Sequence, residues 1–191
     1  MTETTIQIRR ATTDDALPLA SLAAATFPLA CPPSTARSAI DAFIAQHLSL
    51  ERFEGYLADP TREIFVAEGS VGDTILGQTM VGHALLGYTM LVYGEPYDAD
   101  VAVAITHRPT VELSKCYTAA EAHGRGVAPA LIAASVDSAR ERGAEGMWLG
   151  VSQLNARANR FYEKNGFERV GIKLFWVGDE RNEDFVRERA L

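Results

Sequence analysis

Residues 111–166 form the stretch that most restricts how this chain folds, because strand and helix patterns alternate there without a break. A β-branched and aromatic run at 111–118 is followed by a glycine-containing loop at 123–128 and then by a helical apolar stripe. A second alternating run at 146–152 precedes another helical segment that begins near Asn155. Strand patterns of period two that alternate with helical patterns of period 3.6 predict an α/β fold built around a sheet.

The loop at 123–128 has the features of a phosphate-binding turn. Gly124 and Gly126 permit positive φ angles and leave no Cβ in the way of a ligand. The helix that follows, with Pro129 in its first turn, offers free N–H groups and the positive end of its dipole. Pro129 stands where a dinucleotide fingerprint has its third glycine, and the loop lacks the Gly-Lys-Ser/Thr ending of a P-loop. From these residues alone, a phosphate site and a plain solvent turn both stay open.

The segment after 146–152 reads as a helix with two polar side chains on one face. Asn155 and Tyr162 are seven residues apart, so they lie two turns apart on the same side. Ala158 and Phe161 can face the sheet, and the Asn-Gly pair at 165–166 ends the helix.

Two motifs stand in order along residues 111–168. The first is His123-x-x-Gly126-x-Ala128, and the second consists of Asn155, Ala158, Tyr162, Gly166 and Phe167. Together they resemble the acetyl-CoA-binding half of the GNAT superfamily of N-acetyltransferases, with patterns Gln/Arg-x-x-Gly-x-Gly/Ala and Asn-x-x-Ala-x-x-x-Tyr-x-x-x-Gly-Phe. The chain departs from them at His123, which replaces Gln or Arg, and at Pro129, which lacks an N–H for a phosphate. The ending at 175–191 is similar to a bacterial subgroup that includes polyamine acetyltransferases.

The resemblance implies a single N-acetyltransferase domain over residues 1–191, with a mixed, mostly antiparallel sheet of seven strands. Helices would cover both faces, and the two central strands would splay apart. It also implies that acetyl-CoA binds, with its extended arm along the backbone of Cys116 and Thr118. The pyrophosphate would lie at the loop that His123 opens, on the amides of Arg125, Gly126, Val127 and Ala128.

The same resemblance implies roles for two side chains of the second helix. Asn155 would hydrogen-bond the arm, although asparagine is also a favoured helix N-cap. Tyr162 has a phenol with a reference pKa of about 10 and would donate a hydrogen bond or proton to the departing thiolate. A tyrosine that only packs in the core is the alternative.

Deprotonation of an acceptor amine needs a base, and Glu112 is the candidate. It lies inside a predicted central strand, where burial of a carboxylate costs free energy unless the group has a partner or lies in a water-filled cleft. Strand alternation places it on one face with Ser114, Cys116 and Thr118. A structural salt bridge is the alternative role for Glu112. Other candidate bases are His83, His107 and three acids of the long connection at 94–109, which is expected to border the acceptor side: Glu95, Asp98 and Asp100.

Composition excludes several other classes of protein. The net charge of −7 and the absence of a basic stripe argue against a nucleic-acid partner. Cys31 and Cys116 have no metal-ligand spacing, so no metal site is expected. No apolar run approaches the length of a membrane span, and the N-terminus lacks a signal-peptide core, so we expect a cytoplasmic protein without a membrane partner.

The function predicted from these features is transfer of an acetyl group from acetyl-CoA to a primary amine of a small molecule, by direct attack on the thioester. A peptide or protein acetyltransferase, acting on lysine or the N-terminus, is one alternative. A non-catalytic acyl-CoA sensor on the same fold is another. The sequence does not identify the acceptor, because function depends on the site and not on the fold. A homodimer is also open.

Patterns in the rest of the chain predict helices that cover this core and strands that complete the sheet. Helices are expected from about Asp15 to Thr26, after a cap at Ser34 or Thr35, and after a cap at Ser49. Expected strands are 5–11, 63–68, 81–93, 101–105, 168–177 and 185–190, with a turn-rich excursion at 70–78.

Overall fold

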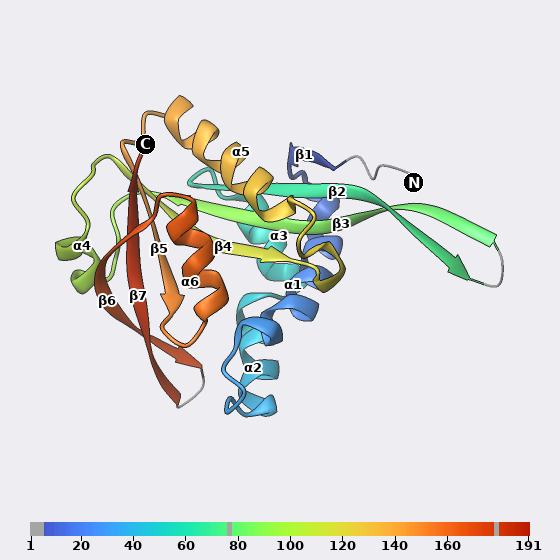
Figure 1. Ribbon diagram of the computed structural model, residues 1–191, viewed down its shortest axis with the longest axis horizontal. Coiled ribbons are helices and arrows are strands. Elements are labelled where there is room, and N and C mark those ends of the chain that lie inside the picture. Colours follow the sequence, from blue (N-terminus) through green and yellow to red (C-terminus); the bar gives the residue numbers. More distant parts are fainter. Residues whose placement is uncertain (1–5, 76–77, 178–179) are drawn as a thin grey trace.

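The computed structural model describes residues 6–75, 78–177 and 180–191, in which seven strands form one sheet with the order β1-β2-β3-β4-β5-β7-β6 (Figure 1). The strands are β1 (Gln7–Arg10), β2 (Arg62–Ile75), β3 (Gln78–Tyr93), β4 (Thr110–Thr118), β5 (Gly146–Ser152), β6 (Glu168–Val177) and β7 (Glu180–Ala190). The helices are α1 (Ala16–Ala30), α2 (Arg37–His47), α3 (Leu50–Ala58), α4 (Ala99–Ala104), α5 (Val127–Glu141) and α6 (Ala156–Lys164). Short 3-10 helices span Thr13–Asp15 and Ala120–Ala122. Neighbouring strands are antiparallel except for β4 and β5, in agreement with the mostly antiparallel sheet that the resemblance implies.

Helices cover both faces of the sheet. On one face α5 and α6 bury an apolar core that includes Leu131 and Leu149. On the other face α1, α2 and α3 pack over Tyr88 and its neighbours, and Figure 1 shows α5 and this group on opposite sides of the strands. The short α4 covers the far end of the sheet, where Val101 contacts Trp148 and its cluster. No helix in the described part of the chain is long and apolar enough to cross a membrane.

The two central strands separate part of the way along, as the resemblance implies. β4 and β5 pair in parallel over only three positions, of which the last joins Glu112 to Trp148. β4 continues to Thr118 and β5 to Ser152. Beyond Glu112, the edge of β4 that faces β5 therefore has no strand partner among the described residues. A free strand edge of this kind can accept an extended ligand as an additional strand.

A β-bulge in β4 changes which side chains share a face. Met90 of β3 pairs with Lys115, but the next residue, Leu91, pairs with Leu113, so Ser114 is an extra residue in β4. An inserted residue breaks the two-residue alternation of a strand. Leu113 and Cys116 consequently pack into the core under α5 and α6. The prediction that Glu112 shares a face with Cys116 and Thr118 is therefore wrong, because the bulge inverts the alternation after Leu113.

Helix α1 also differs from its predicted extent. It continues through Pro28 to Ala30, whereas the sequence predicted an end near Thr26. A proline removes one backbone donor, which the last turn of a helix tolerates better when tertiary contacts hold it. Phe27 supplies such a contact by stacking on Phe43, with ring centroids 4.4 Å apart.

Two other predicted elements are corrected. Most of 101–105 belongs to α4 and not to a strand, because the Asp98 side chain caps that helix by accepting bonds from the amides of Asp100 and Val101. Residues 70–75 continue β2, and Gln78 opens β3, so the expected turn-rich excursion is a long antiparallel hairpin. Residues 76–77 and the side chain of His83 lie outside the described part of the chain.

Candidate active site

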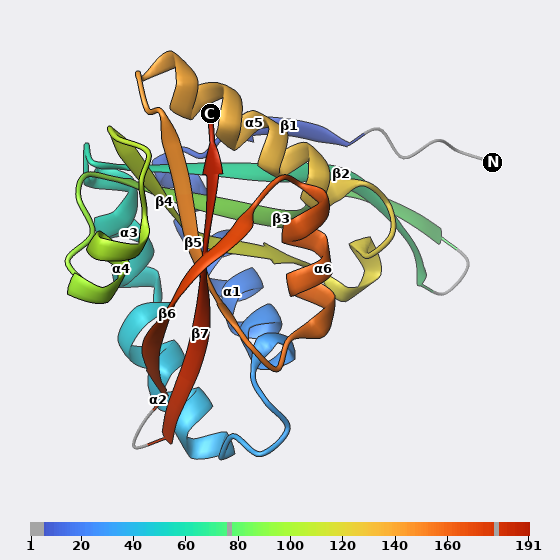
Figure 2. The same ribbon diagram turned by 60° about the vertical axis from the view of Figure 1, so that its left-hand side comes forward.

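A cleft of about 740 Å³ opens where β4 and β5 separate. Its walls come from the end of α1 and the turn after it, the glycine loop, the start of α6, and the β6–β7 hairpin. Figure 2 shows α1 and α6 close to the end of β4. The predicted site residues that line the cleft are Glu112, Cys116, Thr118, His123, Gly126, Val127, Ala128, Asn155 and Tyr162. Tertiary structure thus brings nearly all the predicted site residues into one cavity.

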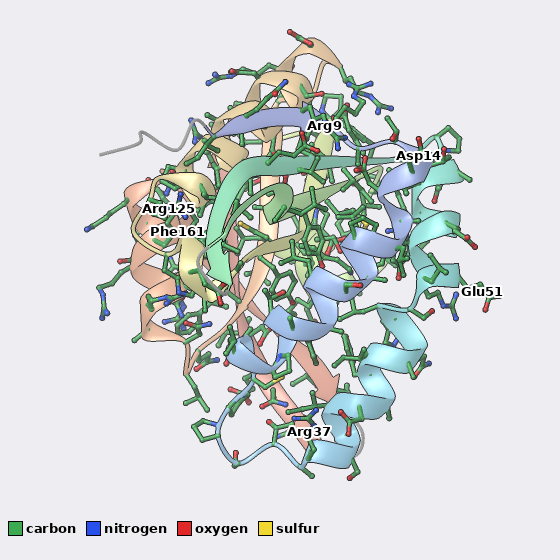
Figure 3. All side chains as sticks on the ribbon, turned by 90° about the vertical axis from the view of Figure 1, so that its right-hand side faces the viewer. Arg9, Asp14, Arg37, Glu51, Arg125 and Phe161 are labelled. Carbon is green, nitrogen blue, oxygen red and sulfur yellow. The ribbon has the colours of Figure 1, made fainter. Side chains whose placement is uncertain are left out.

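Arg125 is the predicted site residue that does not line the cleft. Its side chain is exposed, and its backbone amide donates to the Ala122 carbonyl at 3.3 Å. In Figure 3 it lies in the loop on the same side of the molecule as Phe161 of α6. The loop therefore faces the cleft with residues on both sides of Arg125.

The glycine loop ends in an open cradle at the start of α5. Gly126 is the N-cap residue, with a φ of 82° in the left-handed region that favours glycine. The amide of Ala130 donates to the Gly126 carbonyl at 3.1 Å, so the amides of Val127 and Ala128 precede the first intrahelical bond. A Cβ on Gly126 would meet no atom within 4 Å, so space remains above these donors. The arrangement suits an anion at the positive end of the α5 dipole.

His123 and Arg157 connect this loop to α6. The guanidinium nitrogens of Arg157 lie 3.2 Å from Nδ1 and 3.0 Å from Nε2 of His123. Arg157 also lines the cleft, which places a permanent cation beside the loop. Sequence reasoning missed Arg157, because its approach to His123 is a tertiary contact that no local pattern marks.

Helix α6 positions Asn155 and Tyr162 along the other wall. Asn155 caps the helix, since its Oδ1 accepts a bond from the Ala158 amide at 3.0 Å. The Tyr162 hydroxyl forms a hydrogen bond with the Cys116 thiol of β4. Its ring packs edge-on against Phe167, at a centroid distance of 5.8 Å. The predicted N-cap is confirmed, and the hydroxyl of Tyr162 reaches the strand that the resemblance assigns to the thioester.

Burial keeps both members of this hydrogen bond protonated. It raises the pKa of the Cys116 thiol to about 12, and the bond from Tyr162 opposes this rise only in part. Burial likewise raises the pKa of Tyr162 well above its ordinary value. At neutral pH the cleft thus presents a neutral thiol and a phenol that is available as a donor.

The opposite half of the cleft combines apolar walls with a charged floor. Phe27, Leu29 and Phe43 come from α1 and α2. The floor carries the lysines and acids of three strands, namely Glu112, Lys115, Lys173 and Asp184. Such a pocket suits an organic molecule that has both an apolar part and a charged group.

Glu112 and Lys115 lie in this half because of the bulge in β4. Burial raises the pKa of Glu112, while the positive charges of Lys173, Lys115 and Arg62 oppose the rise. Burial lowers the pKa of Lys115 to about 8, and the charge of Glu112 opposes that change. The carboxylate predicted as a base therefore has cationic neighbours inside the protein.

Asp184 of β7 is a functional candidate that the sequence did not reveal. The carboxylate is only 8% exposed and lines the cleft. Burial raises its pKa to about 6, against the lowering effect of Lys173. The predicted last strand began at Phe185, so no pattern assigned Asp184 a buried position. Its place in the site results from the pairing of β7 with β5, where Asp184 stands opposite Ser152.

The acids of the long connection and His107 have structural roles instead. The carboxylate of Glu95 accepts a bond from Arg108 at 3.0 Å, and Asp98 caps α4. The His107 amide and ring both contact Glu188, the ring at 3.2 Å. None of these side chains, nor that of Asp100, lines the cleft. The prediction that this connection borders the acceptor side is wrong, because α4 packs on the Trp148 cluster, away from the cleft.

Comparisons with known proteins point to one family. Residues 30–167 match the acetyltransferase (GNAT) family. The chain is 40% identical over 179 residues to uncharacterised N-acetyltransferases of Mycobacterium bovis and Mycobacterium tuberculosis, covering 93% of this chain and 98% of each relative.

Solved structures show the same fold at low sequence identity. The PaiA N-acetyltransferase from Thermoplasma acidophilum, in complex with coenzyme A, has a TM-score of 0.72 and 18% identity, covering 98% of this chain and 99% of that one. A ribosomal-protein-alanine N-acetyltransferase from Brucella melitensis has a TM-score of 0.66 and 22% identity, covering 97% and 99%.

Proposed function

Because the chain belongs to the acetyltransferase (GNAT) family and is therefore an acyltransferase, we propose that it transfers the acetyl group of acetyl-CoA to a primary amine of a small molecule. The observation that carries this proposal is the single cleft that joins an anion cradle at α5 to a charged, apolar-walled pocket across the splayed strands. One half has the features needed to hold acetyl-CoA, and the other has those needed to hold an amine.

The residues of the first half fit acetyl-CoA. The amides of Val127 and Ala128 would hold the pyrophosphate, with Arg157 beside them. The edge of β4 that lacks a strand partner, at Cys116 and Thr118, would receive the amide-rich arm as an additional strand. Among the solved structures of this fold, the Thermoplasma acidophilum protein is in complex with coenzyme A, which supports this choice of acyl donor.

The protein's own groups favour direct attack by the amine. Acetyl-CoA would supply an activated thioester carbonyl. Cys116 stays a neutral thiol because burial raises its pKa, so it is a poor nucleophile and a covalent relay through it is disfavoured. Tyr162, which stays protonated, would donate to the departing sulfur. Glu112 is one of two carboxylates in the acceptor half that could receive the proton of the amine.

The experiment is an acceptor screen combined with calorimetry. The protein would be titrated with CoA and then incubated with acetyl-CoA and polyamines, amino acids, aminoglycosides or lysine peptides while free thiol is followed. We expect CoA to bind and thiol release to require a small amine, with the amine-free reaction as background. Release with peptides alone would move the acceptor to proteins, and CoA binding without release for any acceptor would contradict the proposed reaction.

A further inference from the structure

The carboxylate of Asp184 is buried in the cleft without a hydrogen-bond partner for its Oδ1 among the described residues. Burying a charged oxygen without a partner is costly, and most buried polar groups in proteins are paired. An unpaired carboxylate oxygen in the lining of a cleft indicates that the partner arrives with a ligand. The ligand group must be a hydrogen-bond donor, and a positive charge would offset the carboxylate best.

The neighbouring charged groups leave this position open. Lys173 stands opposite Asp184 in the β6–β7 register, but Oδ1 of Asp184 has no hydrogen-bond partner in the part of the chain that the structure describes. The ammonium of Lys173 lies instead over the Trp148 ring, 5.5 Å from its centroid. Tyr117 of β4 also faces Asp184, and burial raises the pKa of its phenol, so it remains neutral. Asp184 therefore keeps a carboxylate oxygen for a ligand.

Gly150 of β5 keeps the approach to this carboxylate open. A Cβ at Gly150 would lie 3.5 Å from Oδ2 of Asp184 and 3.2 Å from Cδ of Lys173. Gly150 itself lines the cleft. Any larger residue at this position would therefore cover the carboxylate with a side chain.

Glu112, the other carboxylate of this half, has different surroundings. The charges of Lys173, Lys115 and Arg62 all act on it, so its negative charge already has cationic neighbours from the protein. For Asp184, the charge of Lys173 alone acts to lower the pKa. An incoming ammonium group is therefore needed more at Asp184 than at Glu112.

We propose that Asp184 binds the ammonium group of the acceptor and takes its proton. This inference rests on the proposed function and specifies how the acceptor half of the same cleft works. The ammonium group gives one proton to the Asp184 carboxylate and becomes a neutral amine. As the amine nitrogen bonds to the thioester carbon, the carbon–sulfur bond breaks. The second proton of the nitrogen ends on the sulfur of CoA, and the first passes from Asp184 to solvent.

The proton-accepting role sets the expected pH dependence. Burial raises the pKa of Asp184 to about 6, so the carboxylate is ionised at neutral pH and can receive a proton. Activity should fall as the pH drops below about 6, because the protonated carboxyl can no longer accept one. The charged group that faces it is Lys173, and the phenol of Tyr117 stays neutral because burial raises its pKa.

The test compares Asp184→Asn with Glu112→Gln and a matched control, Glu183→Gln. Glu183 is the preceding residue on β7, contacts Gln153 and lies outside the cleft lining. We expect Asp184→Asn to lower kcat/KM for the amine by at least about 100-fold, with the affinity for CoA unchanged. The fall in activity at acidic pH should also disappear in this variant. Glu112→Gln should cost less, and Glu183→Gln should stay within about twofold. A larger loss in Glu112→Gln than in Asp184→Asn would overturn the assignment.

Two measurements without turnover make the outcome independent of the assay. First, removal of an unpaired buried charge should leave the melting temperature of Asp184→Asn at pH 8 equal to or above that of the wild type; a clear decrease would show a structural role. Second, primary amines should bind to the CoA complex of the wild type and not to that of Asp184→Asn. If the wild type binds CoA but no amine of the panel, the assignment of Asp184 is wrong while the CoA half of the proposed function stands. If CoA itself does not bind, the proposed function fails first.

Discussion

The protonation of individual side chains in the cleft depends on their burial as much as on their residue type. Tyr162 and Cys116 would titrate near their ordinary values in water, yet both are held protonated inside the cleft. Burial raises the pKa of Asp184 in the same way, because it makes the ionised form less stable. The residues that would handle protons are therefore recognised by their surroundings.

The hydroxyl of Tyr162 is expected to act mainly in turnover. Tyr162→Phe keeps the ring that packs on Phe167 but removes the donor that faces the β4 strand. We expect kcat to fall by about 10- to 100-fold, with the Kd for CoA unchanged within about twofold, because the donor acts as the thiolate forms. Tyr97→Phe, a change at a fully exposed tyrosine, is the control. Equal kcat in Tyr162→Phe and wild type would assign the hydroxyl to packing.

Asp15 should make stability depend on pH at the acidic end. Its carboxylate accepts two bonds from Arg9, at 2.7 and 2.8 Å, which lower its pKa to about 2 despite burial. A lowered pKa stabilises the fold above the ordinary value for aspartate, and this contribution is lost as the pH falls toward about 2. Asp15→Asn should therefore cost about 2 kcal/mol in urea unfolding at pH 7 and much less near pH 2.

The neighbouring Asp14 provides the control for that measurement. Figure 3 shows Asp14 at the start of α1, and its side chain is exposed. Asp14→Asn should change the free energy of unfolding by no more than about 0.5 kcal/mol. A pH-independent difference between Asp15→Asn and wild type would contradict the role of the Arg9 pair.

Among the elements, α5 has glycines in the left-handed region at both of its ends, and only one of them lies at the cleft. Gly126 has a φ of 82° before the helix and Gly143 a φ of 81° after it. A Cβ would meet no atom within 4 Å at either position. The two glycines thus share their backbone conformation and open surroundings, but only Gly126 lines the cleft, which makes them a matched pair.

Substitution of these glycines separates backbone strain from ligand binding. Gly126→Val and Gly143→Val should each cost roughly 1–2 kcal/mol of stability, since both place an L-residue in the left-handed region. Only Gly126→Val should also weaken CoA binding in calorimetry, by at least about tenfold, because its side chain occupies the space above the α5 amides. If the Kd for CoA is the same in both variants, the loop is only a turn.

For the molecule as a whole, the cleft makes the ligand a structural link. Its lining runs from Thr26 of α1 to Asp184 of β7, so segments from most of the chain meet there. β4 and β5 are joined over only three positions, and an arm inserted between their separated ends would connect them. Ligand binding is therefore expected to stabilise the whole fold and not just the loop that holds the phosphates.

Thermal unfolding measures this effect directly. At a free CoA concentration 100 times the Kd, binding to the folded state alone adds about 2.7 kcal/mol. For a chain of 191 residues this should raise the Tm by about 5–10 °C. Gly126→Val should show a smaller rise at the same CoA concentration. An unchanged Tm of the wild type under saturating CoA would show that the cleft does not bind it.

The sequence by itself determined the elements whose signals are local. The glycine loop, the N-cap at Asn155 and the position of Tyr162 on its helix follow from short-range rules of φ, capping and helical period. The resemblance of these motifs to a known family, and not their spacing alone, implied acetyl-CoA as the ligand. The resemblance between motifs then supplied the strand order, which alternation alone does not contain. The mostly antiparallel, seven-stranded sheet agrees with it.

Only the tertiary structure decided which side chains form the half of the cleft that we propose holds the acceptor. The bulge at Ser114 shows in the register between β4 and its partner β3, and no feature of β4 alone marks it. It turned Glu112 and Lys115 toward the helices α1 to α3 and left Cys116 facing α6. Pairing of β7 with β5 buried Asp184, and the packing of α4 on the Trp148 cluster placed the loop acids away from the cleft. Register and packing join residues that are distant in sequence, so single-segment patterns cannot determine them.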